Sequence, residues 1–511
     1  MPAPAASARR SSQASWGWTV GLVCVATFMV ILDLTVVNVA LPEIQASFHS
    51  SLTDLEWVVN TYALLVAGLL LVAGSTGDRV GRRLIFVAGM VVFTGGSLLS
   101  ALAPSTALLI AFRGLQGFGA ALLFSTALGI LGNLFQGEER ARALGLWGVA
   151  IGAGLACGPL VGGLLTQLFG WPAIFLVNLP IGVAVVGLSL WRMPESKDPS
   201  PKRIDKLGAG TLALGLVCLV FALVEGNTLG WDSPLVLGGF LLAIGIGAVF
   251  VRAERRPEPI APLGLLADPR FRAASVGVFG QGLVIGAMLF YLVRFLQQGL
   301  GDSPLVAGLV ILPMTVTAMG AALVGSRLAA ALREEVVIYV SLLLMAVGSA
   351  LMLLLNLSNG WYWLLPGLLL AGMGWGAINP ASAHAALATA PPDQSGMASG
   401  FVNTARQIGI ASGLGGLGAF FELQVRLTTL SSLAGLPAHA RTQIALAASR
   451  SGLPQALMEA PSGDRERVDH AVRTALLAGL HAVLLAAAVG AVLVAASIIL
   501  AAGRGPRSRA V

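Results

Sequence analysis

The feature that most constrains this chain is a series of fourteen long apolar runs separated by short polar segments. A membrane-spanning helix needs about 20 apolar residues, and each run meets that length. Hydrophobic residues make up 56% of the chain and charged residues 11%, whereas soluble domains carry about 25% charged residues. The sequence therefore predicts an all-α integral membrane protein with 14 transmembrane helices. The runs cover residues 17–40, 55–75, 84–103, 106–130, 144–166, 172–191, 207–225, 235–252, 273–297, 304–326, 336–355, 361–385, 401–421 and 475–502.

The placement of positive charge predicts the orientation of these helices. If the N-terminus is cytoplasmic, 22 of the 31 Lys and Arg fall in cytoplasmic segments and none falls in the six short outer loops. Short cytoplasmic loops are enriched in Lys and Arg, while long loops escape this rule. We therefore expect both termini in the cytoplasm and the long loop 422–473 outside. The net charge of +7 then reports topology, and no nucleic-acid partner is expected.

A weak internal repeat predicts two halves. A polar loop followed by a small-residue, Gly-rich helix occurs at 137–163 and again at 392–416. Parallel repeats of this kind mark transporter halves with a substrate site between them. The expected division is a tail at 1–16, a six-helix bundle at 17–191, a cytoplasmic linker at 192–206, two extra helices at 207–252, a second linker at 253–272, a six-helix bundle at 273–502 that includes loop 422–473, and a tail at 503–511.

The segment GSTGDRVGRR at 74–83 lies between the second and third runs, on the expected cytoplasmic side. Its glycines permit a tight turn and close helix approach, and its acid can pair with an arginine or cap a helix. An ordinary positive loop is the alternative for the arginines taken alone. The residues expected to act in gating are Gly74, Asp78, Arg79, Gly81, Arg82 and Arg83.

Two charged residues lie inside apolar runs and are the first candidates for chemistry. Asp33 lies about two thirds of the way along the first run, where an ionised carboxylate is costly. It could bind and release a proton, or it could lie at the outer end and reach water. Arg113, in the fourth run, stays charged in proteins and must be paired or hydrated. One interpretation is that it donates hydrogen bonds to backbone carbonyls of neighbouring helices.

Small residues and amides mark further candidate positions. Glycines at four-residue spacing favour close helix contact, and a proline within the same run kinks it; these residues are Gly154, Gly158, Pro159, Gly162 and Gly163. Polar side chains in other runs are candidates for a substrate cavity or for bonds between helices, namely Asn38, Asn60, Gln116, Gln281, Asn379 and Arg406. The cysteines and histidines lack metal-ligand spacing, so no metal site is expected.

The string at 74–83 resembles the signature loop of the major facilitator superfamily. Other segments resemble its fourteen-span drug:proton antiporter branch: LDLTVVNVALPEI (32–44), LLIAFRGLQGFGAAL (108–122), GLACGPLVGG (154–163) and WPAIFLVNLPIG (171–182). The chain departs from the pattern at Thr76, Pro172 and Ala173. The second-half counterpart of the signature loop, at 325–335, also lacks its acid.

The resemblance implies the major facilitator fold, a role for Asp33 and Arg113 in proton coupling, and export rather than import. We therefore expect a proton-coupled antiporter of the plasma membrane that exports small, lipophilic or cationic drugs or metabolites. Its expected partners are protons, the substrate and the lipid bilayer, and it is expected to act as a monomer without a cofactor. The alternatives are an importer or uniporter of a small metabolite with the same fold, or a membrane receptor or scaffold that does not transport. The sequence contains neither a Walker loop nor paired catalytic residues, so we do not expect an enzyme.

Overall fold

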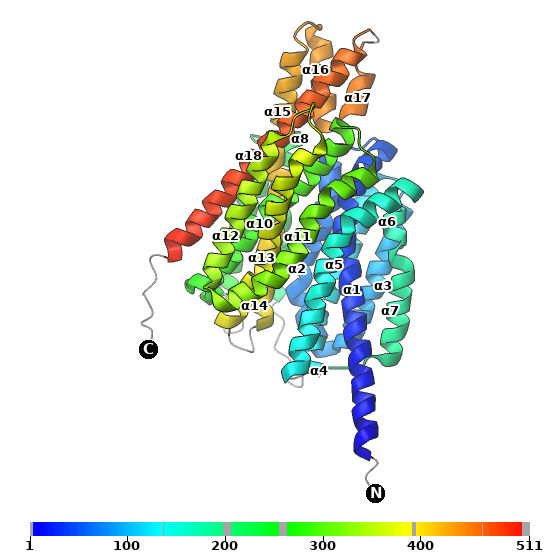
Figure 1. The fold of residues 1–511 in the computed structure, drawn as a ribbon, viewed down its shortest axis with the longest axis vertical. Coiled ribbons are helices and arrows are strands. Elements are labelled where there is room, and N and C mark those ends of the chain that lie inside the picture. Colours follow the sequence, from blue (N-terminus) through cyan, green and yellow to red (C-terminus); the bar gives the residue numbers. More distant parts are fainter. Residues whose placement is uncertain are drawn as a thin grey trace.

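The computed structural model describes residues 4–135, 137–197, 206–254, 263–390, 395–461 and 463–502, and in these residues the regular structure is helical throughout (Figure 1). The first half comprises α1 (Pro4–Phe48), α2 (Leu52–Val80), α3 (Arg82–Ala101), α4 (Thr106–Leu134), α5 (Gly137–Phe169), α6 (Ala173–Leu176) and α7 (Asn178–Arg192). Two further helices, α8 (Lys206–Leu229) and α9 (Pro234–Ala253), follow it.

The second half begins after a short 3-10 helix, η1 (Leu263–Ala267). It comprises α10 (Pro269–Arg294), η2 (Phe295–Gly299), α11 (Pro304–Ala331), α12 (Glu334–Leu351), η3 (Met352–Leu354), η4 (Trp361–Leu364), α13 (Leu365–Thr389), α14 (Ser395–Ala411), η6 (Ser412–Gly416), α15 (Leu417–Ser432), α16 (Ala438–Arg450), α17 (Leu453–Met458) and α18 (Arg465–Ala502). Of these, η2 and η6 are π-helical turns.

The expected number of spans is confirmed. In the described chain, 13 helical segments are long and apolar enough to cross a membrane. The helix α2, with 29 residues, lies between the first two of them and is the fourteenth span. Each span coincides with one of the apolar runs, and α6 and α7 together form the sixth.

Several helix starts are encoded by local capping chemistry. Ser51 and Asp54 form a reciprocal capping box at the start of α2, which satisfies two backbone donors that a helix leaves unpaired. Ser105 caps α4 and Ser303 caps α11. In α11 the cap is followed by Pro304 in the first turn, where its fixed φ suits a helix and its missing N–H is not needed.

Both halves repeat the same helix pairing. In the first half α1 packs on α5, α2 on α4 and α3 on α4; in the second half α10 packs on α14, α11 on α13 and α12 on α13. The helices α8 and α9 pack on each other, and α8 also packs on α2. The inserted pair therefore adds to the periphery without interrupting either six-helix set.

The long loop expected at 422–473 is largely helical. The helix α15 continues to Ser432 and α18 begins at Arg465, so both spans extend into the region expected to be loop. The short helices α16 and α17 join them in a protruding hairpin (Figure 1). We call this end of the molecule the hairpin end; the start of α1 and the end of α18 lie toward the opposite, terminal end (Figure 1).

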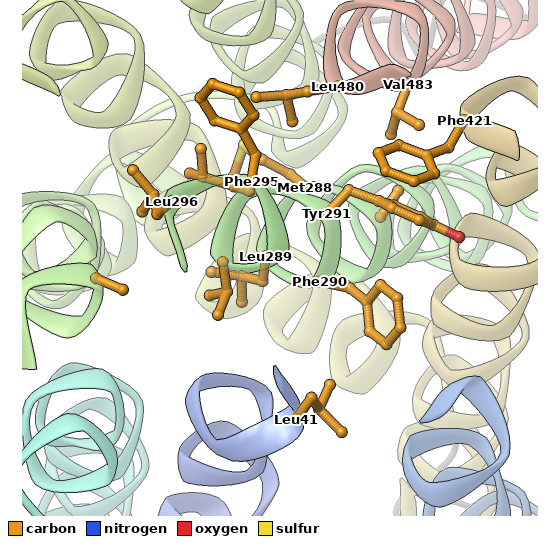
Figure 2. Packing of buried hydrophobic residues seen from close by; sticks show 14 of the residues in the cluster. Leu41, Met288, Leu289, Phe290, Tyr291, Phe295, Leu296, Phe421, Leu480 and Val483 are labelled. Carbon is orange, nitrogen blue, oxygen red and sulfur yellow. The ribbon is translucent and has the colours of Figure 1, made fainter. Parts of the chain in front are cut away.

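The hydrophobic core is shared at the hairpin end and divided at the terminal end. One large cluster joins Leu41 of the first half to Tyr291 and Phe421 of the second, as Figure 2 shows around α10. The main clusters at the terminal end are separate, one around Phe86 in the first half and one around Phe271 in the second, and a small cluster around Phe250 of α9 touches both α2 and α14. The halves are thus packed together at the hairpin end and have separate cores at the terminal end.

Candidate functional site

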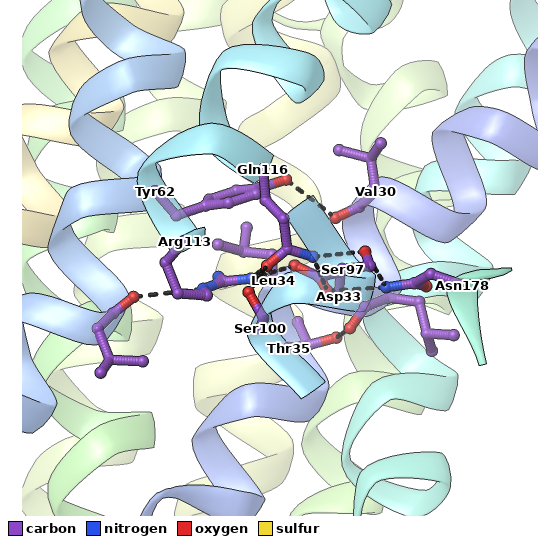
Figure 3. Close-up of polar contacts among 12 residues, drawn as sticks. Val30, Asp33, Leu34, Thr35, Tyr62, Ser97, Ser100, Arg113, Gln116 and Asn178 are labelled. Atoms are coloured by element: carbon purple, nitrogen blue, oxygen red, sulfur yellow. Dashed lines mark hydrogen bonds and ion pairs between the residues drawn. The ribbon is translucent and has the colours of Figure 1, made fainter. Parts of the chain in front are cut away.

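The two charged residues singled out in the first half form a buried ion pair. Arg113 Nη1 on α4 lies 2.5 Å from Asp33 Oδ2 on α1 (Figure 3). Each of the two residues is only 1% exposed. A buried ion pair persists only when its remaining polar atoms are also satisfied, so the surrounding donors and acceptors decide what this pair can do.

Two amides complete the coordination of the Asp33 carboxylate. Its Oδ1 accepts hydrogen bonds from Gln116 Nε2 at 3.1 Å and from Asn178 Nδ2 at 3.0 Å. Both amides also donate to Ser97 Oγ, at 2.7 Å and 3.2 Å. These side chains come from α1, α3, α4 and α7 (Figure 3). Four helices of the first half therefore meet on one carboxylate.

The guanidinium of Arg113 is held by contacts besides the ion pair. Its Nη1 donates to Gln116 Oε1 at 2.9 Å, and that oxygen also accepts from Ser100 Oγ at 3.2 Å. Its Nε donates to the Val58 carbonyl of α2 at 3.3 Å. The guanidinium carbon lies 4.4 Å from the centre of the Tyr62 ring, within the range of a cation–π interaction. Arg113 can therefore keep several partners if Asp33 loses its charge.

The signature loop is held by residues that follow α7. The backbone N–H of Arg82 donates to the Ser196 carbonyl at 2.9 Å, and that of Arg83 donates to Glu195 Oε1 at 3.0 Å. The connecting residue Gly81 has φ +135°, and a Cβ there would come within 2.9 Å of the Glu195 carboxylate. Only glycine suits that conformation. Glu195 is a partner that the sequence interpretation missed, because nothing local indicates that segment 193–197 folds back.

The contacts of the other residues in the signature loop do not indicate whether they act in gating. Gly74 packs loosely against Ser125 of α4, and Arg79 is exposed. The side chain of Asp78 lies outside the described part of the chain. The expected gating role of the loop stays a prediction.

The glycine motif on α5 brings that helix against α1 beside Asp33. A Cβ at Gly158 would collide with Thr35 Oγ1, and one at Gly162 would lie 2.9 Å from the Val36 carbonyl. Gly154 is equally close to Ile31. The glycines that face α1 are Gly154, Gly158 and Gly162. Because these contacts flank Asp33 on α1, a movement of α1 must be accompanied by a movement of α5.

The same motif also joins the two halves. A Cβ at Gly163 would lie 2.6 Å from the Pro304 carbonyl of α11, and the Pro159 carbonyl abuts Gly308. Toward the terminal end of α5, in contrast, Gly145 and Gly148 have open space around them. The contact between α5 and α11 is therefore closest toward the hairpin end.

The residues expected to line a cavity lie in four different environments. Gln116 belongs to the Asp33 network. Gln281 donates to Asn379 at 3.2 Å in the second half, and Arg406 donates to Asn403 at 3.3 Å nearby on α14. Asn38 donates to its own helix at the Leu34 carbonyl. Asn60 is fully buried, and neither of its amide atoms has a partner among the described residues.

A polar contact between the halves at the hairpin end was missed in the sequence. Tyr291 Oη of α10 lies 2.7 Å from Glu56 Oε1 of α2 and 3.1 Å from the Leu414 carbonyl in the π-helical turn η6. Both side chains are buried, and Gly418 leaves no room for a Cβ beside them. Glu56 lies just after the capping box, so its position resembled a polar helix start and gave no signal of burial.

Two six-helix sets that repeat the same pairing, joined by a shared core and with a charged network inside one set, are the architecture of a polytopic membrane transporter. The chain matches the family model "Major Facilitator Superfamily" over residues 23–414. It belongs to that family, and to the fourteen-span branch whose relatives are drug and antibiotic efflux proteins.

Curated relatives cover most of the chain. A probable actinorhodin transporter of Streptomyces coelicolor is 36% identical over 443 residues, which is 84% of this chain and 76% of the relative. The multidrug resistance protein Stp of Mycobacterium tuberculosis is 36% identical over 77% of this chain and 73% of its own length. The multidrug efflux pump LfrA of Mycolicibacterium smegmatis is 32% identical over 81% and 82%.

Solved structures show the same fold. A bacterial homologue of the human lysosomal transporter Spinster, in an inward-facing and unoccupied conformation, aligns with a TM-score of 0.68 at 17% identity. The alignment covers 96% of this chain and 97% of that one.

Proposed function

We propose that this protein is a proton-coupled antiporter that exports drug-like small molecules across a bacterial plasma membrane. Relatives named as transporters, resistance proteins and efflux pumps cover about four fifths of the chain and support export. The protein acts as a monomer, draws its energy from the proton gradient and uses no cofactor.

The observation that carries this proposal is the buried Asp33–Arg113 pair. Asp33 receives three donors, from Arg113, Gln116 and Asn178. A proton on Asp33 removes the negative charge that these donors stabilise, while Arg113 retains Gln116 and the Val58 carbonyl as acceptors. Proton binding therefore loosens α1 from α4, while Arg113 loses its counter-ion and keeps two neutral hydrogen-bond acceptors.

That local change reaches the interface between the halves through α5. Thr35, two residues after Asp33, packs against Gly158, and the adjacent Pro159 packs against Gly308 of α11. With the termini in the cytoplasm, the shared core at the hairpin end closes the outer side of the protein. In the proposed cycle, this arrangement receives substrate from the cytoplasm once Asp33 has released its proton.

The test is transport into everted membrane vesicles that carry an imposed pH gradient. Two dyes of opposite charge, cationic ethidium and anionic fluorescein, are offered. The parent is expected to accumulate at least one of them only while the gradient persists, and Asp33→Asn is expected to lose this response. Asp232→Asn, an exposed aspartate in the turn before α9, is the matched control. Membrane abundance of each variant is measured by quantitative immunoblot, and rates are normalised to it.

Two results would contradict the proposal. Parental gradient-driven transport by Asp33→Asn would remove Asp33 from coupling. Dye movement in the opposite direction, out of everted vesicles, would indicate import.

A further inference from the structure

The second half contains a polar group that the proton-coupling network does not use. It consists of Gln281 on α10, Asn379 on α13, and Asn403, Arg406 and Gln407 on α14. Gln281 Nε2 lies 3.2 Å from Asn379 Oδ1, and a Cβ on the next residue, Gly282, would collide with the Arg406 carbonyl. Three helices therefore present amides and one guanidinium at the same level of the bundle.

Arg406 lacks a counter-ion. Among the described residues no carboxylate lies within ion-pair distance of it, and its only described hydrogen bond is to Asn403 Oδ1 at 3.3 Å. Its Nε is buried without a partner. An arginine inside a membrane protein is normally paired, as Arg113 is with Asp33. The described part of the chain therefore supplies no carboxylate that pairs with the guanidinium of Arg406.

The neighbouring amides offer unsatisfied acceptors. Gln281 and Gln407 are 1% and 9% exposed, and the Oε1 of each is buried without a hydrogen-bond donor. Asn379, Asn403 and Arg406 are partly exposed. A ligand that carries both an anionic oxygen for the guanidinium and a hydroxyl for an amide oxygen would satisfy these atoms.

The side chains of Asn403 and Gln407 lie between two packing faces of α14. On one side, Gly409 contacts the backbone of α10, and the Arg406 carbonyl abuts Gly282 of the same helix. On the other side, Thr404 donates to the Ala67 carbonyl of α2, and Ala411 packs in the cluster with α8. Residues three and four apart share a helix face, so Arg406 borders the contact with α10: its backbone packs there, while the described hydrogen bond of its side chain is to Asn403.

We infer that Arg406, with Gln281 and Gln407, binds the acidic group of the exported substrate, and that the substrate class is lipophilic organic anions that also carry a hydroxyl. This rests on the proposed export function and narrows it. The sequence and the resemblance led us to expect lipophilic or cationic substrates, but the acid singled out in the first span, Asp33, already pairs with Arg113.

The experiment compares two dyes with the same xanthene ring system, anionic fluorescein and cationic rhodamine 123, at pH 7.5. Binding to purified protein in nanodiscs is followed by fluorescence anisotropy without a pH gradient. The parent is expected to bind fluorescein more tightly than rhodamine 123. Arg406→Gln is expected to weaken fluorescein binding by about tenfold or more, the effect of one charge-assisted hydrogen bond, and to leave rhodamine 123 binding unchanged.

Two further variants separate charge from folding. Arg406→Lys keeps the positive charge and is expected to retain the preference for fluorescein. Arg426→Gln removes an exposed arginine from α15 and is expected to behave as the parent. Size-exclusion profiles of all variants establish that each is folded.

Three outcomes would overturn the inference: no measurable fluorescein binding by the parent, equal or tighter binding of rhodamine 123, or an equal loss of both dyes in Arg406→Gln. Because the binding assay needs no gradient, its outcome is separate from that of the transport assay. Selective binding without gradient-driven transport would overturn the exporter proposal and leave the anion site standing.

Discussion

The ion pair between Asp33 and Arg113 changes the expected effect of Asp33 substitutions on the stability of the protein. From the sequence alone, Asp33→Asn removes a costly buried charge and should be no less stable than the parent. With Arg113 at 2.5 Å, the same change leaves a buried guanidinium without its counter-ion. Breaking a buried pair on one side costs about 3–5 kcal/mol, so the expected effect on stability is reversed in sign.

A double-mutant cycle measures this coupling. Asp33→Asn and Arg113→Gln are each expected to lower the free energy of unfolding by about 3–5 kcal/mol. The double variant is expected to recover most of that loss, because neither charge is then left alone. Thermal unfolding in detergent provides the measurement. Additive losses in the double variant would mean that the pair does not interact as the structure places it.

The pairing of Asp33 with Arg113 could not be read from the sequence, although both residues were identified as candidates. The two are 80 positions apart, and each lies in its own apolar run. Periodicity places a residue on a face of its helix but does not say which helix that face meets. The partnership of Glu56 with Tyr291 was hidden for the same reason, since it crosses between the halves.

At the scale of helices, the sequence predicts well which segments span the membrane and predicts poorly the residues at which the last two helices begin and end. All 14 spans coincide with apolar runs because crossing a bilayer demands apolar length. The expected ends of the thirteenth and fourteenth spans, 421 and 475, are wrong by about ten residues. The helices α15 and α18 run on to Ser432 and back to Arg465, since helix formation does not stop where apolar composition stops.

Two glycines on α5 provide a matched test of the helix contact beside Asp33. A Cβ at Gly158 collides with Thr35, whereas a Cβ at Gly148 meets open space. Gly158→Ala is expected to reduce gradient-driven efflux about fivefold or more, because overpacking costs about 1–3 kcal/mol. Gly148→Ala is expected to transport normally. The rates are compared in everted vesicles at equal membrane abundance; equal rates would show that α1 and α5 need not touch.

At the scale of the whole molecule, the side of the membrane on which each end lies is testable by labelling. Thr442 on α16 and Lys197 after α7 are both exposed. In a background where the native residues Cys24, Cys157 and Cys218 are serine, Thr442→Cys is expected to react with an impermeant maleimide in intact cells. Lys197→Cys is expected to react only after the cells are opened. Labelling of Lys197→Cys in intact cells would reverse the orientation.

Closure at the hairpin end is testable by cross-linking the two halves. Gln298 of η2 donates to Gln45 of α1 at 2.9 Å, so cysteines at these positions lie within reach of a short bifunctional thiosulfonate. The cross-linked protein is expected to lose efflux, and dithiothreitol is expected to restore it. Each single cysteine variant treated in the same way is the control. Full efflux by the cross-linked protein would show that the halves need not separate at this end.

The unbroken helix α18 connects the hairpin rigidly to the second half of the molecule. Its 38 residues span about 57 Å, from the terminal end of the second half to the part of the hairpin that follows α17. The base of the hairpin also touches the first half, where Gln45 donates to the Arg450 carbonyl at 3.4 Å. A few degrees of rocking between the halves is therefore magnified into a displacement of several ångströms at α16. With one dye on α16 and a second on the first half, energy transfer between the dyes would change during each transport cycle. An antibody fragment bound to the end of the hairpin would slow transport by restricting this movement.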